Sequence, residues 1–167
     1  MGHPVLRERA RPLDKSDLKS AVVQRLIDDM IDTMHEYHGV GLAAPQVHEP
    51  LRIFVALLDD EPDAKSETIV VINPEIIPNT EATEEGWEGC LSIPDIRGRV
   101  PRFTDIRVKA LDRTGRAIEL ALKDFPARVA QHETDHLDGV LFFDRMKTFG
   151  TLTFMDEYSR YWSKDED

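Results

Sequence analysis

The sequence predicts a mixed α and β protein in which helices accompany antiparallel strands. Three observations support this fold class. Apolar residues between Val22 and Met34 recur at helical spacing, and a second helical stripe runs from Phe125 to His136. Between these helices, Asp112-Arg-Thr-Gly115 is a hairpin turn signal that joins two segments of strand-forming residues, 104–111 and 116–122.

Composition predicts one domain over residues 1–167, with an acidic C-terminal tail at about 156–167. The formal net charge of −11 argues against general binding of nucleic acid or of an anionic membrane. No apolar run approaches the roughly 20 residues of a membrane span, and the first residues lack a signal-peptide pattern. A single cysteine excludes an internal disulfide and favours a reducing compartment, so we expect a cytoplasmic protein.

The first predicted element is a long amphipathic helix from about residue 17 to residue 37, with Ser16 as its N-cap. Its methionines and isoleucines are expected to pack in the core. His35 and His38 lie near its C-terminal end, where a cation suits the helix dipole, and are not expected to bind metal.

Strands are predicted at 51–58 and 68–72, with an acidic loop at 59–67 between them. Prolines and turn residues delimit the pattern: Asn73-Pro74 is expected to end the second strand, residues 79–85 to form a polar turn, and Pro101 to interrupt the chain before the hairpin. A short strand is predicted at 140–143. We expect Glu84, Glu85 and Glu88 to be solvated surface residues.

The stretch Gln131–Gly139 contains His132, Glu133 and His136 in the spacing H-E-x-x-H. Residues four apart on a helix share a face, so both imidazoles can reach one metal ion, with Glu133 beside it as a general base.

The same helix face carries Phe125 and Val129, which makes it a core-facing stripe in which two histidines replace apolar residues. Asp124 or Phe125 is the expected helix start, and Gly139 the expected stop. The alternative interpretation is that both histidines are ordinary helix residues.

Cys90 is the candidate for a third ligand. A lone cysteine is usually a small buried apolar residue. However, a thiolate binds soft divalent metals well, and Gly89 lets the backbone pass close to a site. Two histidines from a helix and one cysteine from a strand would leave one coordination position open for water.

Three segments together resemble the signature motifs of the peptide deformylase family: Gly39-Val-Gly-Leu-Ala-Ala-Pro-Gln46, Glu88-Gly-Cys-Leu-Ser92 and Gln131-His-Glu-Thr-Asp-His-Leu-Asp-Gly139. The resemblance covers roughly residues 2 to 148. It implies an α+β fold with antiparallel β-sheets packed around a central helix that carries H-E-x-x-H, together with a long N-terminal helix. It also implies a metal-dependent hydrolase that removes the formyl group from the N-terminal formyl-methionine of newly made polypeptides and releases formate.

The resemblance assigns roles to individual residues. One divalent metal ion is expected per chain, with Fe2+ as the physiological ion and Zn2+, Ni2+ or Co2+ as replacements, on the ligands Cys90, His132 and His136. Metal-bound water is expected to attack the formyl carbon, with Glu133 as general acid/base and with Gln46 and the backbone N–H of Leu91 as donors to the oxyanion. The methionine pocket and peptide groove are expected at Val40, Gly41, Phe125 and Val129.

The chain also departs from the family pattern. Only Met1 precedes the segment Gly2-His-Pro-Val-Leu6, and His48 stands where the family often has glycine. The C-terminal helix that helps some members bind ribosomes is basic, whereas this chain ends in acidic residues. The expected partners are therefore nascent formyl-methionyl polypeptides, with only transient proximity to the ribosome, no nucleic acid and no membrane. We expect a monomer.

Two other functions use the same motif. A thermolysin-like metallopeptidase would need an acidic third ligand downstream, for which Asp156 and Glu157 are candidates. A non-catalytic binding module would use a fully coordinated metal for folding alone. Arg97 and Arg102 could either bind the peptide substrate or pair with Glu88.

Overall fold

The computed structural model describes residues 1–62 and 66–163. Within them, one sheet has the strand order β1-β2-β3-β6-β7 and a second has the order β4-β5-β8, and every pairing between these strands is antiparallel. The strands of the larger sheet are β1 (Gly41–Ala43), β2 (Ile53–Leu57), β3 (Thr68–Pro78), β6 (Asp105–Leu111) and β7 (Ala117–Lys123). Those of the smaller sheet are β4 (Thr83–Cys90), β5 (Ile93–Phe103) and β8 (Thr153–Phe154). The prediction of a mixed helix and antiparallel-sheet protein is confirmed.

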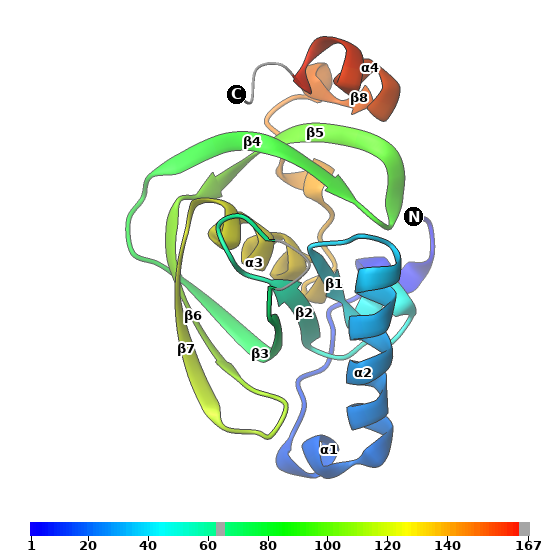
Figure 1. Ribbon diagram of the computed structural model, residues 1–167, viewed down its shortest axis with the longest axis vertical. Coiled ribbons are helices and arrows are strands. Elements are labelled where there is room, and N and C mark those ends of the chain that lie inside the picture. Colours follow the sequence, from blue (N-terminus) through cyan, green and yellow to red (C-terminus); the bar gives the residue numbers. More distant parts are fainter. Residues whose placement is uncertain (63–65, 164–167) are drawn as a thin grey trace.

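The α-helices lie around and between these sheets (Figure 1). They are α1 (Lys15–Lys19), α2 (Ala21–Glu36), α3 (Asp124–Leu137) and α4 (Met155–Tyr161). Short 3-10 helices occur at η1 (Pro4–Arg7), η2 (Ala44–Val47), η3 (Phe142–Arg145) and η4 (Phe149–Thr151). Figure 1 shows α3 in the middle of the molecule, α2 along one side and α4 beyond β5 and β8. Among the described residues, no helix is long and apolar enough to cross a membrane.

Strand β2 divides the core because successive strand residues point to opposite faces of a sheet. Phe54 and Ala56 face one way, into a cluster with Ala127 and Ala130 of α3. The alternate residues face the other way, into a cluster with the apolar stripe of α2: Ile53, Val55 and Leu57 join Ile27, Met30 and Met34. The larger sheet is therefore packed on one face by α3 and on the other by α2.

The predicted helix over 17–37 is wrong at its start, because the chain forms two helices there. Asp14 caps α1 by accepting hydrogen bonds from the backbone N–H groups of Ser16 and Asp17, so Ser16 lies inside a helix. Ser20 then takes an extended backbone (φ −69°, ψ 127°) and caps α2 through a hydrogen bond from the N–H of Val22. The cap at Ser20 thus separates two helices that the apolar pattern alone predicts as one.

Two predicted strand ends are also wrong. Strand β3 continues through Asn73-Pro74, where the register shifts between Ile72 and Glu75 and Asn73 takes a left-handed backbone (φ 52°). A bulge of this kind absorbs an extra residue without ending the strand. Strand β5 likewise runs through Pro101, which lies opposite Glu85 of β4.

The structure differs from the predicted elements at β4 and at 140–143, and agrees with the predicted hairpin. Strand β4 begins at Thr83, inside the predicted turn 79–85, and the predicted strand 140–143 is absent from the described structure, where η3 begins at Phe142. The hairpin is confirmed, because the turn at 112–115 joins β6 and β7. Part of the predicted acidic loop, 63–65, and the acidic end, 164–167, lie outside the described residues.

Candidate metal centre and active site

The two histidines of the motif lie on one face of α3. Their rings are 5.0 Å apart between centroids and meet edge to face. Helix α3 starts at Asp124 with Pro126 in its first turn, and Gly139 takes a left-handed backbone (φ 74°) just after its end. His136 is buried against the core, and the side chain of His132 is only 11% exposed.

Cys90, the last residue of β4, brings its sulfur to these histidines. The Sγ atom lies 3.3 Å from Nε2 of His136, and one candidate ligand atom from each of Cys90, His132 and His136 lies within 4.8 Å of the others. Within the described residues, this is the group of side chains that can hold a metal ion. A thiolate and two imidazoles suit a borderline divalent metal, and three protein ligands leave a position for water or substrate.

Glu133 is buried beside this cluster, and its Oε2 atom has no hydrogen-bond partner among the residues that the structure describes. Burial raises the pKa of Glu133 to about 7. A buried carboxylate that can both accept and donate a proton near neutral pH has the property expected of a general base. The backbone of Gly41 in β1 packs directly on this carboxylate, and a Cβ at Gly41 would lie 2.8 Å from Cδ of Glu133.

Gln46, in η2, points its amide toward the same cluster. Its Oε1 accepts a hydrogen bond of 2.8 Å from the N–H of Ala43, which turns the NH2 group toward Sγ of Cys90 (3.6 Å) and Oγ of Ser92 (3.1 Å). Leu91 follows Cys90 directly at a partly exposed position. Two potential donors, the Gln46 amide and the Leu91 N–H, therefore come from segments next to the cysteine.

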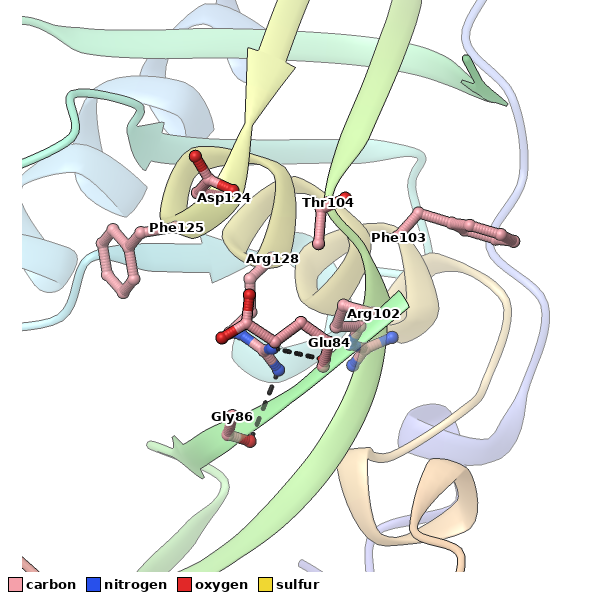
Figure 2. Close-up of a pocket in the computed structure, with 8 residues that line it drawn as sticks. All are labelled: Glu84, Gly86, Arg102, Phe103, Thr104, Asp124, Phe125 and Arg128. Carbon is pink, nitrogen blue, oxygen red and sulfur yellow. Dashed lines mark hydrogen bonds between the residues drawn. The ribbon is translucent and has the colours of Figure 1, made fainter. Parts of the chain in front are cut away.

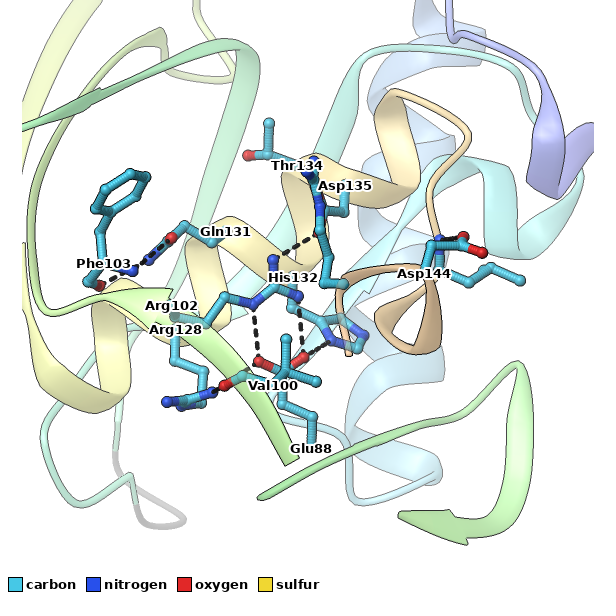
Figure 3. A network of polar contacts seen from close by, with 12 residues as sticks. Glu88, Val100, Arg102, Phe103, Arg128, Gln131, His132, Thr134, Asp135 and Asp144 are labelled. Atoms are coloured by element: carbon cyan, nitrogen blue, oxygen red, sulfur yellow. Dashed lines mark hydrogen bonds and ion pairs between the residues drawn. The ribbon is translucent and has the colours of Figure 1, made fainter. Parts of the chain in front are cut away.

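Glu88 is buried, at 5% exposure, and the prediction that it is a solvated surface residue is wrong. Its carboxylate accepts hydrogen bonds from Arg102 (2.8 and 3.0 Å), from Arg128 (3.0 Å) and from Nδ1 of His132 (2.8 Å) (Figure 3). Burial would raise the pKa of Glu88, but the bonds from His132 and Arg102 outweigh it and hold the pKa well below its usual range. The ionised carboxylate keeps a proton on Nδ1 of His132 and leaves Nε2 for a metal.

Two arginines of β5, Arg97 and Arg102, have distinct partners. Arg102 is buried and pairs with Glu88 and with Asp135, which rules out a role in binding peptide from solvent. Arg97 lies over the ring of Tyr158 and donates a hydrogen bond to Sδ of Met155.

The residues predicted to line the substrate site come from two segments, one at the start of β1 and one on α3. Val40 is partly exposed just before Gly41, and the neighbouring Gly39 packs against the side chain of Leu91. On α3, Val129 is buried in the core cluster around Phe54, whereas Phe125 is 39% exposed. Phe125 borders a cavity of about 150 Å³ that also contacts Gly86 and Arg128 (Figure 2).

The comparisons with known proteins fit this geometry. A family model described as "Polypeptide deformylase" matches residues 1–151. The chain belongs to the peptide deformylase family. The relative named peptide deformylase 2 from Nostoc sp. is 41% identical and covers 99% of this chain and 93% of its own length. The peptide deformylase of Thermotoga neapolitana is 45% identical over 87% of this chain and 84% of its own length.

Solved structures agree on the fold. The crystal structure of the Thermotoga maritima peptide deformylase superposes with a TM-score of 0.80 at 42% identity, covering 89% of this chain and 95% of that one. A Met-Ala-Ser-bound class I type b peptide deformylase from Acinetobacter baumannii gives a TM-score of 0.80 at 38% identity, covering 87% and 94%. The chain is therefore a hydrolase that removes the formyl group from the N-terminus of newly made polypeptides.

Sequence reasoning missed the polar shell behind the centre. Arg128, Asp135 and Ser92 each contact a predicted site residue or the partner of one, yet none was predicted to belong to the site. Two of these residues lie close in the sequence to predicted site residues, which could have indicated them. Ser92 lies two residues after Cys90, and Asp135 lies between Glu133 and His136.

Proposed function

We propose that Cys90, His132 and His136 hold one divalent metal ion on the face of α3, the central helix of a single catalytic domain over residues 1–167. The observation that carries this proposal is the convergence of one thiol and two imidazoles within 4.8 Å, next to a buried carboxylate. We take Fe2+ as the physiological ion, with Zn2+, Ni2+ or Co2+ as replacements, because the family depends on a metal and this donor set accepts all of them. When bound, the ion supplies Lewis-acid chemistry that makes hydroxide available from water near neutral pH.

Glu133 is the proton carrier of the proposed reaction. Its unpartnered Oε2 and its pKa of about 7 suit it to take the proton of the attacking water and pass it to the departing amine. The products are formate and a free N-terminus. A group whose pKa lies near the working pH serves in both directions.

Gln46 and Leu91 stabilise the negative charge that develops on the formyl oxygen. Because the Gln46 carbonyl is fixed by Ala43, its NH2 group is oriented toward Cys90 before substrate arrives. The backbone N–H of Leu91 is the second donor. Loss of one such donor typically raises a barrier by about 2.7–4 kcal/mol.

The substrate is formyl-methionine at the start of a nascent polypeptide, held by Val40, Gly41, Phe125 and Val129. Support comes from the placement of Gly41 against Glu133 and of the Val40 segment beside Leu91. The Acinetobacter baumannii relative binds Met-Ala-Ser, which has the form of the deformylated product.

We further propose that the protein works as a cytoplasmic monomer on nascent chains, close to the ribosome only transiently. It is expected to bind neither nucleic acid nor membrane, in keeping with a formal net charge of −11.

Metal content after single substitutions tests the proposed ligands. Cys90→Ser replaces a ligand and should reduce bound metal from about one ion per chain to a small fraction. Asp156→Asn and Glu157→Gln, on α4, should leave the metal in place, whereas a thermolysin-like site would lose metal in one of them and keep it in Cys90→Ser. Metal retained in Cys90→Ser would contradict the proposed ligand set.

A further inference from the structure

Asp135 lies between Glu133 and His136 of the motif, and its carboxylate contacts two arginines rather than a residue of the proposed ligand set. Its side chain is 9% exposed and accepts hydrogen bonds from Nη1 of Arg102 (2.6 Å) and from Nη2 of Arg145 (2.7 Å). A buried carboxylate needs such partners, so its placement between two arginines is specific.

Arg102 connects this carboxylate to Glu88. The guanidinium uses its Nε and Nη2 edge for a two-point contact with the carboxylate of Glu88, at 2.8 and 3.0 Å. The remaining Nη1 is the atom that Asp135 holds. Because the guanidinium is planar and rigid, fixing one corner fixes the direction of the opposite edge.

Glu88 in turn holds the first histidine, through the 2.8 Å contact between its Oε2 and Nδ1 of His132. A continuous chain of buried contacts therefore runs from Asp135 through Arg102 and Glu88 to His132 (Figure 3). Arg145, whose side chain is half exposed, pairs with Asp135 at the end of this series of contacts that is farthest from His132.

We propose that Asp135 is a positioning residue that sets the metal affinity of the centre by acting through Arg102 and Glu88 on His132. This inference rests on the proposed role of His132 as a ligand. Without the Asp135 carboxylate, Arg102 loses the contact that orients it, and its full charge is left to Glu88. Glu88 then accepts the Nδ1 proton of His132 less strongly, so Nε2 becomes a weaker donor to metal.

The test is the dissociation constant for Co2+, measured by competition with a chelator without oxygen, in variants of the full chain. Glu88→Gln should weaken binding about 10–100-fold, as loss of a carboxylate behind a histidine ligand typically does. Asp135→Asn should weaken binding several-fold, and the visible absorption bands of bound Co2+ should shift in the same direction in both variants.

Asp138→Asn is the matched control, since Asp138 is another aspartate at the end of α3 and, like Asp135, it borders a cavity of about 590 Å³. Its side chain pairs with Arg52 at 2.7 Å and with Arg9 at 3.7 Å, and neither arginine is a partner of Glu88 or His132 in the described structure. This variant should bind Co2+ within about twofold of the wild type.

A double-mutant cycle separates positioning from general loss of structure. If Asp135 acts through Glu88, adding Asp135→Asn to Glu88→Gln should change the dissociation constant by less than about twofold. If the double variant instead weakens Co2+ binding by the product of the two single effects, the proposal is overturned. It is also overturned if Asp135→Asn has the same dissociation constant as the control. Should Asp135→Asn fail to fold, Arg145→Met must show the same direction of change, and an unchanged affinity there overturns the proposal. A wild type that takes up no Co2+ overturns the proposed function as well.

Discussion

The backbone of Gly41 lies against the side chain of Glu133, so the first and third sequence motifs meet at one contact. A Cβ at Gly41 would fall 2.8 Å from Cδ and nearer still to Oε1 of Glu133, closer than side chains tolerate. Glu133 is buried and its position is set by α3, so it has little room to retreat. Glycine at this position is therefore required for the observed placement of the Glu133 side chain.

Substitution Gly41→Ala should lower kcat by about 10²-fold, because a displacement of about 1 Å in a catalytic group costs that much. The metal content should stay at the wild-type value, since the three atoms nearest to the added Cβ all belong to Glu133 and not to a proposed ligand. Gly150→Ala is the control, because a Cβ there meets nothing nearer than 3.5 Å. Equal kcat values for the two variants would contradict the proposed contact.

Glu133 should make the metal-free protein less stable as the pH rises. Burial raises its pKa to about 7 in the folded chain, above the ordinary value of 4.5, so the folded state binds the proton more tightly. The loss of unfolding free energy caused by ionising the buried Glu133 is absent below pH about 4.5, grows as the pH rises, and is complete above about 7.

Glu133→Gln removes this titration. In chelator, thermal unfolding of Glu133→Gln should occur at a higher temperature than wild type at pH 8, and the two should converge at pH 4.5. A constant difference at both pH values would show that Glu133 is not the titrating group.

The buried network should contribute strongly to stability when only one member is removed. Arg102→Met leaves the buried carboxylates of Glu88 and Asp135 without a main partner, and such a break typically costs about 3–5 kcal/mol of unfolding free energy. Urea denaturation measures this loss. Arg116→Met removes an exposed ion pair to Asp112 and should leave the denaturation midpoint unchanged.

Asn73 should be needed for stability but not for catalysis. Its side chain accepts a hydrogen bond from the N–H of Leu13 and donates one to its carbonyl, at 2.9 and 2.8 Å, from a left-handed backbone. Asn73→Ala loses both bonds and disfavours that backbone, so we expect a loss of about 2–3 kcal/mol. Denaturant midpoints would show this, with kcat within about twofold of wild type. A fall in kcat without a fall in stability would contradict this role.

The candidate metal ligands could be predicted from the sequence alone, because residue type and local spacing indicate them. His132 and His136 share a helix face, and Cys90 is the sole cysteine, so these three residues stood out as a shared metal centre. The hairpin at 112–115 followed from its turn residues in the same way.

Glu88 was misjudged for a physical reason. Its neighbours Glu84, which is exposed, and Glu85, which is half-buried, make an acidic surface segment the natural interpretation. The groups that stabilise its buried charge come from positions 14, 40 and 44 residues away, in β5 and α3. Local sequence carries no signal for partners that only the tertiary fold brings together. The helix break at Ser20 was missed for a different reason. The apolar residues continue at helical spacing across Ser20, so the pattern predicts one helix.

The most direct test of the proposed reaction is formate release from formyl-Met-Ala-Ser by protein purified without oxygen, with metal content measured on the same sample. We expect release by the wild type with about one metal ion per chain, and a loss of about 10²–10⁴-fold in kcat in Glu133→Ala with the metal retained. A non-catalytic module would bind metal and release no formate. Formate release that persists unchanged in Glu133→Ala would contradict the assignment of Glu133 as the proton carrier.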